Sequence, residues 1–247
     1  MSEDTLTTVD DFLSGRVQVV QPAKGFRAGT DSVLLAAALN AGARGEALEI
    51  GCGAGGALLP AAWRVQGMQF TGLERDLPSA ALAVEGVAIN NLEDRVMIVE
   101  GDAGNLPAEW ENRFDLVFSN PPFFEAGKIM EPGQGKQDAY IETLSLKDWL
   151  SGMLFAVRPK GTIVMIHRAA ELARILSVLE RRSGDITVLP VRSAPGEEAK
   201  RVLVRARKGL RPGPLKLLAG VDLYQARGGE RTQTLEAIAA DGAGLVW

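Results

Sequence analysis

Short apolar runs alternate with helix-like segments through most of the chain. Runs of five to seven residues that stop at glycine, acidic or Asn-Pro positions are typical of buried strands. Segments with apolar residues three and four positions apart predict amphipathic helices between them. The predicted strands are 46–51, 69–74, 96–102, 114–119, 162–167, 185–191 and 201–206. The predicted helices are 57–65, 78–91, 146–157, 169–182 and 232–240.

This alternation predicts an α/β fold, a mostly parallel sheet with helices on both faces. The last two strands follow one another without a helix, so we expect them to form an antiparallel pair at the sheet edge. Residues 1–45 predict a short hairpin around 16–20 and a helix at 31–41, and a polar loop is expected at about 125–140. Because no repeat or low-complexity linker interrupts residues 1–247, we expect a single domain in which 1–45 is an extension over the ligand site.

The composition, 46% hydrophobic and 23% charged over 247 residues, is ordinary for a globular protein. No apolar run approaches the roughly 18 residues of a membrane span, and the acidic first residues lack the apolar core of a signal peptide. One cysteine and one histidine, Cys52 and His167, argue against a disulfide framework and a metal site. We expect a cytoplasmic protein without metal or membrane contact, and we assign His167 no catalytic role.

Charge is divided unevenly along the chain. Residues 1–157 carry 22 Asp and Glu against 11 Lys and Arg, whereas residues 158–231 carry 16 Lys and Arg against 7 Asp and Glu. The second segment is therefore basic although the net charge is −4. It is either a solvated surface or a field presented to a polyanion such as RNA, which requires its basic residues to gather on the face of the catalytic site.

A glycine-rich loop follows the first predicted strand, in the sequence Glu49-Ile-Gly51-Cys52-Gly53-Ala-Gly55-Gly56. Loops at the carboxyl ends of parallel strands bind ligands in α/β folds, and glycine lets the backbone approach closely. The spacing also fits a dinucleotide site. However, the carboxylate of Glu49 would repel a pyrophosphate and suits the cationic end of S-adenosylmethionine (SAM). Cys52 is expected to fill the tight loop rather than to act as a nucleophile.

Two further strands also end in acids. Glu74 is placed to accept hydrogen bonds from ribose hydroxyls, and Asp102 from an adenine amine. Each alone is explained by a solvated strand end or a helix cap, but acids at three consecutive strand ends favour a SAM site.

The most specific motif is Asn120-Pro121-Pro122-Phe123, directly after the fourth strand. The amine of a conjugated base is a poor nucleophile, because its lone pair is delocalised into the ring. The Asn120 side-chain carbonyl and the Pro121 backbone carbonyl can accept its two N–H groups and favour the pyramidal nitrogen of the transition state. Prolines fix these acceptors, and Phe123 is expected to stack on an extruded base.

With these motifs, the chain resembles the bacterial valine-tRNA adenine-N6 methyltransferases, a group of the class I methyltransferases that carry Asn-Pro-Pro-Phe/Tyr. Further matches are Gly29–Leu35, Arg158–Thr162 and Arg201–Ala206. The resemblance implies a Rossmann-like, seven-stranded sheet with an antiparallel last strand, SAM as cofactor, and RNA, most simply tRNA, as substrate. It also implies that a cofactor-binding set surrounds SAM: Phe26, Thr30, Asp31, Glu49, Gly51, Cys52, Gly53, Gly55, Glu74, Arg75, Asp102, Ala103 and Asn120.

Other functions share these motifs. The acceptor can be guanine N2 in RNA or a glutamine side-chain amide, which also present conjugated nitrogens. A SAM- or RNA-binding module without turnover and an NAD-dependent oxidoreductase are the alternatives of another class. A homodimer is a further expectation, because a small enzyme has little surface with which to grip tRNA.

Overall fold

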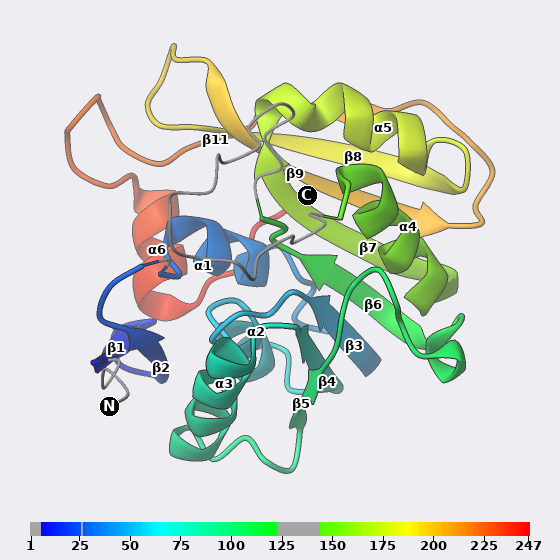
Figure 1. Cartoon of the computed structure of the whole chain (residues 1–247). Coiled ribbons are helices and arrows are strands. Elements are labelled where there is room, and N and C mark those ends of the chain that lie inside the picture. The colour runs from blue at the N-terminus through cyan, green and yellow to red at the C-terminus, as the bar shows by residue number, and fades with distance from the viewer. Residues whose placement is uncertain (1–5, 26, 123–143) are drawn as a thin grey trace, which may run out of the picture.

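The computed structural model describes residues 6–25, 27–122 and 144–247, and a twisted central sheet organises them (Figure 1). Its long strands are β3 (Gly45–Ile50), β4 (Met68–Glu74), β5 (Val96–Glu100), β6 (Phe114–Ser119), β7 (Val157–Arg168), β8 (Ser183–Arg192) and β9 (Ala199–Lys208). They lie in the order β8-β9-β7-β6-β3-β4-β5, and β9 is antiparallel to both neighbours. The seven predicted strands and the antiparallel last strand are present, but across the described residues the sheet has nine strands rather than the predicted seven.

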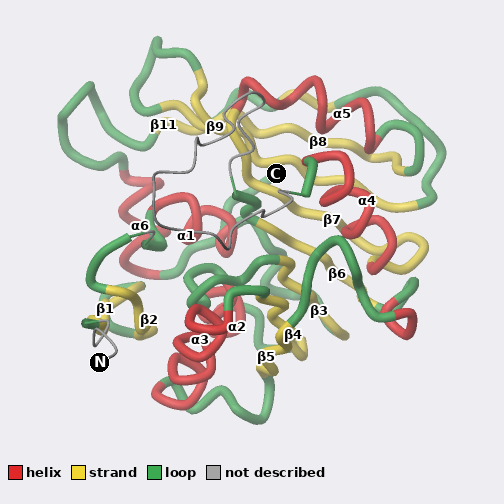
Figure 2. Tube along the Cα trace, viewed as in Figure 1, coloured by secondary structure: helices red, strands yellow, loops and turns green. Residues whose placement is uncertain are grey.

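Helices cover both faces of the sheet (Figure 2). One face carries α1 (Thr30–Ala37), α2 (Leu58–Arg64), α3 (Leu77–Ile89) and α6 (Gln233–Asp241), and the other carries α4 (Leu146–Ala156) and α5 (Leu172–Leu179). Strand β7 shows how both faces are filled, because Val164 and Ile166 pack into the first core while Ile163 and Met165 pack into the second. A strand buried on both faces is apolar throughout, which is why it reads as a continuous run in the sequence.

The structure departs from the predicted elements at a few places. The expected turn at 159–161 lies inside β7, where Lys160 adopts a φ of 65° and the pairing with β6 shifts register. The predicted helix 169–182 is a 3₁₀ turn (Ala169–Glu171) followed by α5, and a second 3₁₀ turn (Ala108–Trp110) precedes β6. Two strands of two residues each, β10 (Lys216–Leu217) and β11 (Val221–Asp222), extend the sheet beside β8.

The N-terminal extension contains the expected hairpin, formed by β1 (Thr7–Phe12) and β2 (Val17–Pro22), followed by α1. The predicted polar loop at 125–140 lies outside the described residues. In the described part of the chain, no helix is both long and apolar enough to cross a membrane.

The last residues of the chain hold the C-terminal end of α1. The Leu245 N–H donates to the carbonyl of Ala37 at 2.8 Å, and the Trp247 indole N–H donates to the carbonyl of Ala38 at 3.0 Å. Arg205 of β9 donates to the Trp247 carbonyl at 3.0 Å and lies over its ring, 4.9 Å from the centroid. Helix α1 is thereby tied to the sheet by residues far from it in sequence.

Candidate functional site

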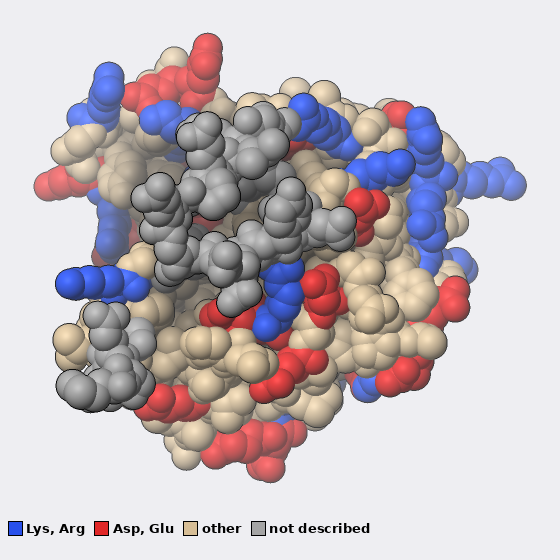
Figure 3. Space-filling view, in the orientation of Figure 1, with Lys and Arg blue, Asp and Glu red and all other residues tan. Residues whose placement is uncertain are grey.

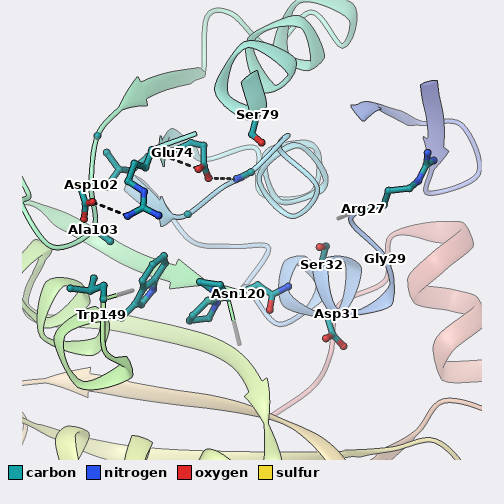
Figure 4. Close-up of a pocket in the computed structure, with 18 of the residues that line it drawn as sticks. Arg27, Gly29, Asp31, Ser32, Glu74, Ser79, Asp102, Ala103, Asn120 and Trp149 are labelled. Atoms are coloured by element: carbon teal, nitrogen blue, oxygen red, sulfur yellow. Dashed lines mark hydrogen bonds and ion pairs between the residues drawn. The ribbon is translucent and has the colours of Figure 1, made fainter. Parts of the chain in front are cut away.

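A pocket of about 580 Å³ opens at the carboxyl ends of β3, β4, β5 and β6 (Figure 4). In an open α/β sheet this edge is where ligands bind. The pocket is lined by Arg27, Gly29, Thr30, Asp31, Ser32, Gly51, Gly53, Leu73, Glu74, Arg75, Ser79, Gly101, Asp102, Ala103, Asn120, Pro121, Pro122, Leu144, Trp149 and Arg201. It therefore brings together the glycine loop, two of the three predicted acids and the Asn-Pro-Pro motif.

The ends of β3 and β6 are joined to α4 by two hydrogen bonds. Ser119 Oγ donates to the carbonyl of Ile50 at 2.6 Å, and the Trp149 indole N–H donates to Ser119 Oγ at 2.9 Å. Gly51 has a φ of 72°, and a Cβ there would lie 2.8 Å from the Trp149 ring. The glycine is thus required twice, for its backbone conformation and for the indole beside it. This contact fixes the residue that precedes Asn120.

Glu74 is held by three backbone N–H groups. Its Oε2 accepts from Gly53 at 2.8 Å, and its Oε1 accepts from Arg75 at 2.9 Å and from Asp76 at 2.8 Å. Each carboxylate oxygen has more than one acceptor site, so the group can still accept hydrogen bonds from a ligand. The side chain is fixed in the pocket wall.

Asp102 is more open than Glu74, with a side chain 42% exposed. Its Oδ1 accepts from the Gly104 N–H at 2.7 Å, while Arg75 Nη1 lies 3.3 Å from Oδ2 (Figure 4). The ends of β4 and β5 are bridged by this ion pair, which is partly solvated and contributes little stability by itself. Both residues line the pocket at the predicted adenine end.

Glu49 lies behind the glycine loop and does not line the pocket. Only 2% of the residue is exposed, and its Oε2 has no hydrogen-bond partner among the described residues. Burial, followed by the neighbouring Glu74, raises the pKa of the Glu49 carboxyl well above its usual range, which the Leu58 backbone N–H only partly offsets. Burial therefore disfavours the charged form of this carboxyl.

Cys52 and Gly55, also predicted at the cofactor, do not line the pocket either. Burial raises the pKa of the Cys52 thiol well above its usual range, and the nearby carboxylates Glu49 and Glu74 raise it further. A thiol of this kind is a poor nucleophile. Its sulfur lies 2.8 Å from where a Cβ on Gly72 would stand, which agrees with the prediction that Cys52 fills a tight loop.

Asn120 and Pro121 line the pocket opposite Glu74 and Asp102. No described residue forms a hydrogen bond with the Asn120 side chain, which leaves its carbonyl available to a substrate in the part of the site that the structure describes. Thr30 and Asp31 line the wall formed by α1, as predicted. The predicted Phe26 and Phe123 lie outside the described residues.

Sequence reasoning missed several lining residues. Arg201 Nε donates to Asp31 Oδ2 at 2.7 Å, which joins β9 to α1 at the pocket. Because β9 is antiparallel, its first residues lie at the edge where the parallel strands end, and this geometry was a usable signal for Arg201. The sequence contains no comparable signal for Trp149, since the helical pattern of α4 does not distinguish a pocket-facing from a core-facing aromatic residue.

The cationic residues of the basic segment lie at both edges of the sheet, which favours the alternative of a solvated surface over a single basic surface around Asn120. Arg168 and Arg201 are paired in register at the edge that carries Asn120. Arg207 and Lys208 lie at the other end of β9, and Arg158 begins β7 at that opposite edge. His167, the buried histidine at the end of β7, does not line the pocket, and burial lowers its pKa.

Comparison with known proteins gives this geometry a context. Residues 24–132 match the family model described as methyltransferase small domain. A tRNA1(Val) (adenine(37)-N6)-methyltransferase of Porphyromonas gingivalis is 30% identical over 204 residues, 78% of this chain and 79% of the relative. One of the same name from Shewanella baltica is 26% identical over 220 residues, 88% of this chain and 92% of the relative.

Solved structures agree with the fold. A predicted O-methyltransferase from Agrobacterium tumefaciens superposes with a TM-score of 0.69 at 22% identity, over 87% of this chain and 98% of the other. TYW2 from M. jannaschii, solved with AdoMet, gives a TM-score of 0.58 at 14% identity over 85% of this chain and 89% of its own. The chain therefore shares the overall fold of these two structures.

Proposed function

The chain belongs to the tRNA1(Val) (adenine(37)-N6)-methyltransferase family, and on that premise we propose that it transfers the methyl group of SAM to N6 of an adenine in tRNA. The observation that carries this proposal is the meeting of Asn120 and Pro121 with Glu74 and Asp102 in one pocket. A methyl acceptor and a nucleoside-bearing donor can therefore bind within reach of each other.

The protein is a SAM-dependent methyltransferase, and the residues of the pocket fit that cofactor. A volume of about 580 Å³ lies within the usual range for a ligand of this size. We assign Glu74 to the ribose hydroxyls, Asp102 and Ala103 to the adenine, and Thr30 and Asp31 to the methionine end. When bound, SAM supplies an electrophilic methyl group on a sulfonium.

Asn120 and Pro121 act on the acceptor nitrogen. Their carbonyl oxygens accept the two N–H groups of the adenine amine and draw its lone pair out of conjugation with the ring. The N–C bond forms as the S–C bond breaks, and the cationic amine then releases a proton to water. No strong general base is needed, because the methylated amine is acidic.

The direct test is transfer of labelled methyl from SAM into unmodified bacterial tRNA, followed by digestion and mass spectrometry of the nucleosides. N6-methyladenosine is the expected product. Methylated guanosine would keep the mechanism and overturn the adenine assignment. A label in protein glutamine, with none in RNA, would overturn the RNA assignment.

The predicted homodimer is a separate part of the proposal. A second copy would enlarge the surface available to tRNA, which is the physical reason for expecting it. Light scattering of the purified protein with and without tRNA tests this, and a monomer under both conditions would remove it without affecting the reaction.

A further inference from the structure

A second pocket, of about 510 Å³, adjoins the first. Ala103 and Leu144 line both pockets, so the second pocket is a depression directly beside the first. The second pocket is lined by Ala103, Gly104, Asn105, Leu106, Leu144, Asp148, Ser151, Gly152, Phe155 and Arg182. It runs between the loop that follows β5 and helix α4, away from Asn120 and towards the end of α5.

Its walls combine apolar and polar groups. Gly152 brings α4 against the loop, since a Cβ there would lie 2.9 Å from the carbonyl of Ala103. Phe155 is partly buried, and Asn105 and Ser151 add hydrogen-bonding groups. An aromatic side chain flanked by small polar residues suits a nucleobase, which stacks on one and bonds to the others.

The far end of this pocket is basic. Arg182 lines it, and Lys208 Nζ donates to Asn112 Oδ1 at 2.6 Å and to the Val157 carbonyl at 2.8 Å. The backbone N–H of Asn112 in turn donates to the carbonyl of Phe155 at 2.9 Å, which joins the basic end to the aromatic wall. The pKa of Lys208 is lowered by burial and then by Arg182, with Glu111 opposing.

Other cations surround this end. Arg181 is exposed next to Arg182, and the backbone of exposed Arg211 passes beside Gly184 at the start of β8. Figure 3 shows several Lys and Arg side chains towards the right-hand side of the molecule, where α5 ends in Figure 1. No ion pair to Arg182 occurs among the described residues, so this guanidinium is available to an anion.

The acidic member of the pocket is already engaged. Asp148 accepts from Ser145 Oγ at 2.6 Å, at the N-terminus of α4 and near the first pocket. The depression therefore changes from an acidic end beside the cofactor site to a basic end at Arg182. A ligand that follows it needs its negative charge at the far end.

We propose that this second pocket holds a nucleotide of the tRNA strand next to the target adenine, with its base against Phe155 and its phosphate on Arg182. This rests on the proposed function, because the pocket becomes useful only if the acceptor is part of a polynucleotide. In this arrangement the RNA strand leaves the catalytic site along the second pocket. The charge complementarity favours RNA over a glutamine-bearing protein loop as the occupant.

The first test compares Arg182→Gln with Arg174→Gln, an exposed arginine on α5 that pairs with Glu171 and does not line the pocket. Arg182→Gln is expected to raise the KM for tRNA several-fold, leave kcat and SAM affinity unchanged, and reduce the slope of log Kd against log salt by about one phosphate contact. Arg174→Gln is expected to change none of these. Equal effects of the two variants would overturn the assignment.

A second variant separates the base from the phosphate. Phe155→Leu keeps the side chain apolar while removing the ring, so tRNA affinity should fall several-fold with the salt slope unchanged. An unchanged affinity would overturn the stacking role of Phe155.

Failure of this proposal and of the proposed function are distinguishable. If the wild-type protein methylates tRNA while Arg182→Gln and Phe155→Leu both keep the wild-type KM for tRNA, the assignment of the second pocket is wrong and the proposed function stands. If the wild-type protein methylates no RNA, fluorescence anisotropy of labelled tRNA can still measure whether the protein binds tRNA and whether Arg182 contributes to that binding. Binding weakened by Arg182→Gln alone would support the route, whereas absent or equally weakened binding would overturn it.

Discussion

The two sides of the pocket are built in different ways. On the side of β4 and β5, carboxylates are engaged by the protein's own N–H groups, Glu74 by those of Gly53, Arg75 and Asp76 and Asp102 by that of Gly104. On the side of β6, the motif presents Asn120 on a proline-fixed turn, and the Asn120 side chain forms no hydrogen bond with another described residue. Figure 3 shows acidic side chains along the lower part of this face and several basic ones towards the upper right.

The difference shows which side of the pocket is ordered before a ligand binds. The cofactor side is ordered before its ligand arrives, which lowers the entropy cost of binding. The acceptor side instead leaves hydrogen-bonding capacity unused until the substrate nitrogen enters, which is where transition-state stabilisation is gained. Substitutions on the two sides should therefore affect different kinetic constants.

Asn120→Ala should have the largest effect. It removes one of the two acceptors for the substrate amine, and losses of about 10²–10³ in kcat are typical of such preorganised groups. SAM affinity should change less than about twofold, since Asn120 is assigned to the acceptor. Single-turnover methylation and calorimetry measure both, with exposed Asn40→Ala as control. Loss of SAM binding would show that Asn120 belongs to the cofactor side.

Glu74→Gln should mainly weaken SAM binding rather than lower kcat. One of the oxygens that now accept backbone N–H groups becomes an NH₂ donor, so the Kd for SAM should rise roughly 10–100-fold, the equivalent of one charged hydrogen bond. At saturating SAM, kcat should fall much less. Glu100→Gln, directly opposite in register and exposed, is the matched control. A fall in kcat with unchanged Kd would contradict the comparison.

Trp149→Phe should produce an intermediate effect, because it loosens Asn120 through Ser119 without touching the motif. Loss of one indole hydrogen bond, worth about 1 kcal/mol, corresponds to a decrease of roughly fivefold in kcat. Combining it with Ser119→Ala in a double-mutant cycle should give less than additive losses. Trp63→Phe on α2, outside the pocket, controls for general destabilisation. Additive losses would argue against the coupling.

The smallest expected effect concerns Glu49. Because its pKa is raised in the folded state, the folded protein binds more protons than the unfolded chain above pH 4.5. The contribution of the Glu49 carboxyl to the free energy of unfolding is therefore fully present below that pH. It is lost as the pH rises towards the pKa that the carboxyl has in the folded protein. Glu49→Gln should flatten the decline in Tm as the pH rises above 4.5, by roughly 2–4 °C for each kcal/mol involved. Identical pH profiles would show that the carboxyl is not buried in solution.

Added SAM sharpens this result. If Glu49 faces the cationic end of the cofactor, as its place before the glycine loop in the sequence predicts, SAM should raise the Tm of the wild type more than that of Glu49→Gln. Equal increases in the two proteins would separate Glu49 from the cofactor site.

Local patterns predicted most of the fold because its strands are buried on both faces and its helices on one. β6 was predicted residue for residue, since Asn120-Pro121 stops it. The two-residue strands β10 and β11 could not be predicted, because their pairing with β8 has no local hydrophobic signature. Gly51 and Asn120 were recognisable in the sequence, because their positions follow from the local backbone at the end of a strand. Trp149 and Arg182 were not, because their positions depend on how separate elements pack.

The anchoring of α1 by residues 245–247 bears on the order in which the protein is made. Helix α1 supplies Thr30, Asp31 and Ser32 to the pocket early in the chain, yet its end is held by Leu245 and Trp247. During synthesis, this wall therefore cannot reach its final anchorage until Trp247 has left the ribosome. A nascent chain could form much of its sheet and still bind SAM poorly, so that competence to methylate arrives only after translation has passed the final tryptophan.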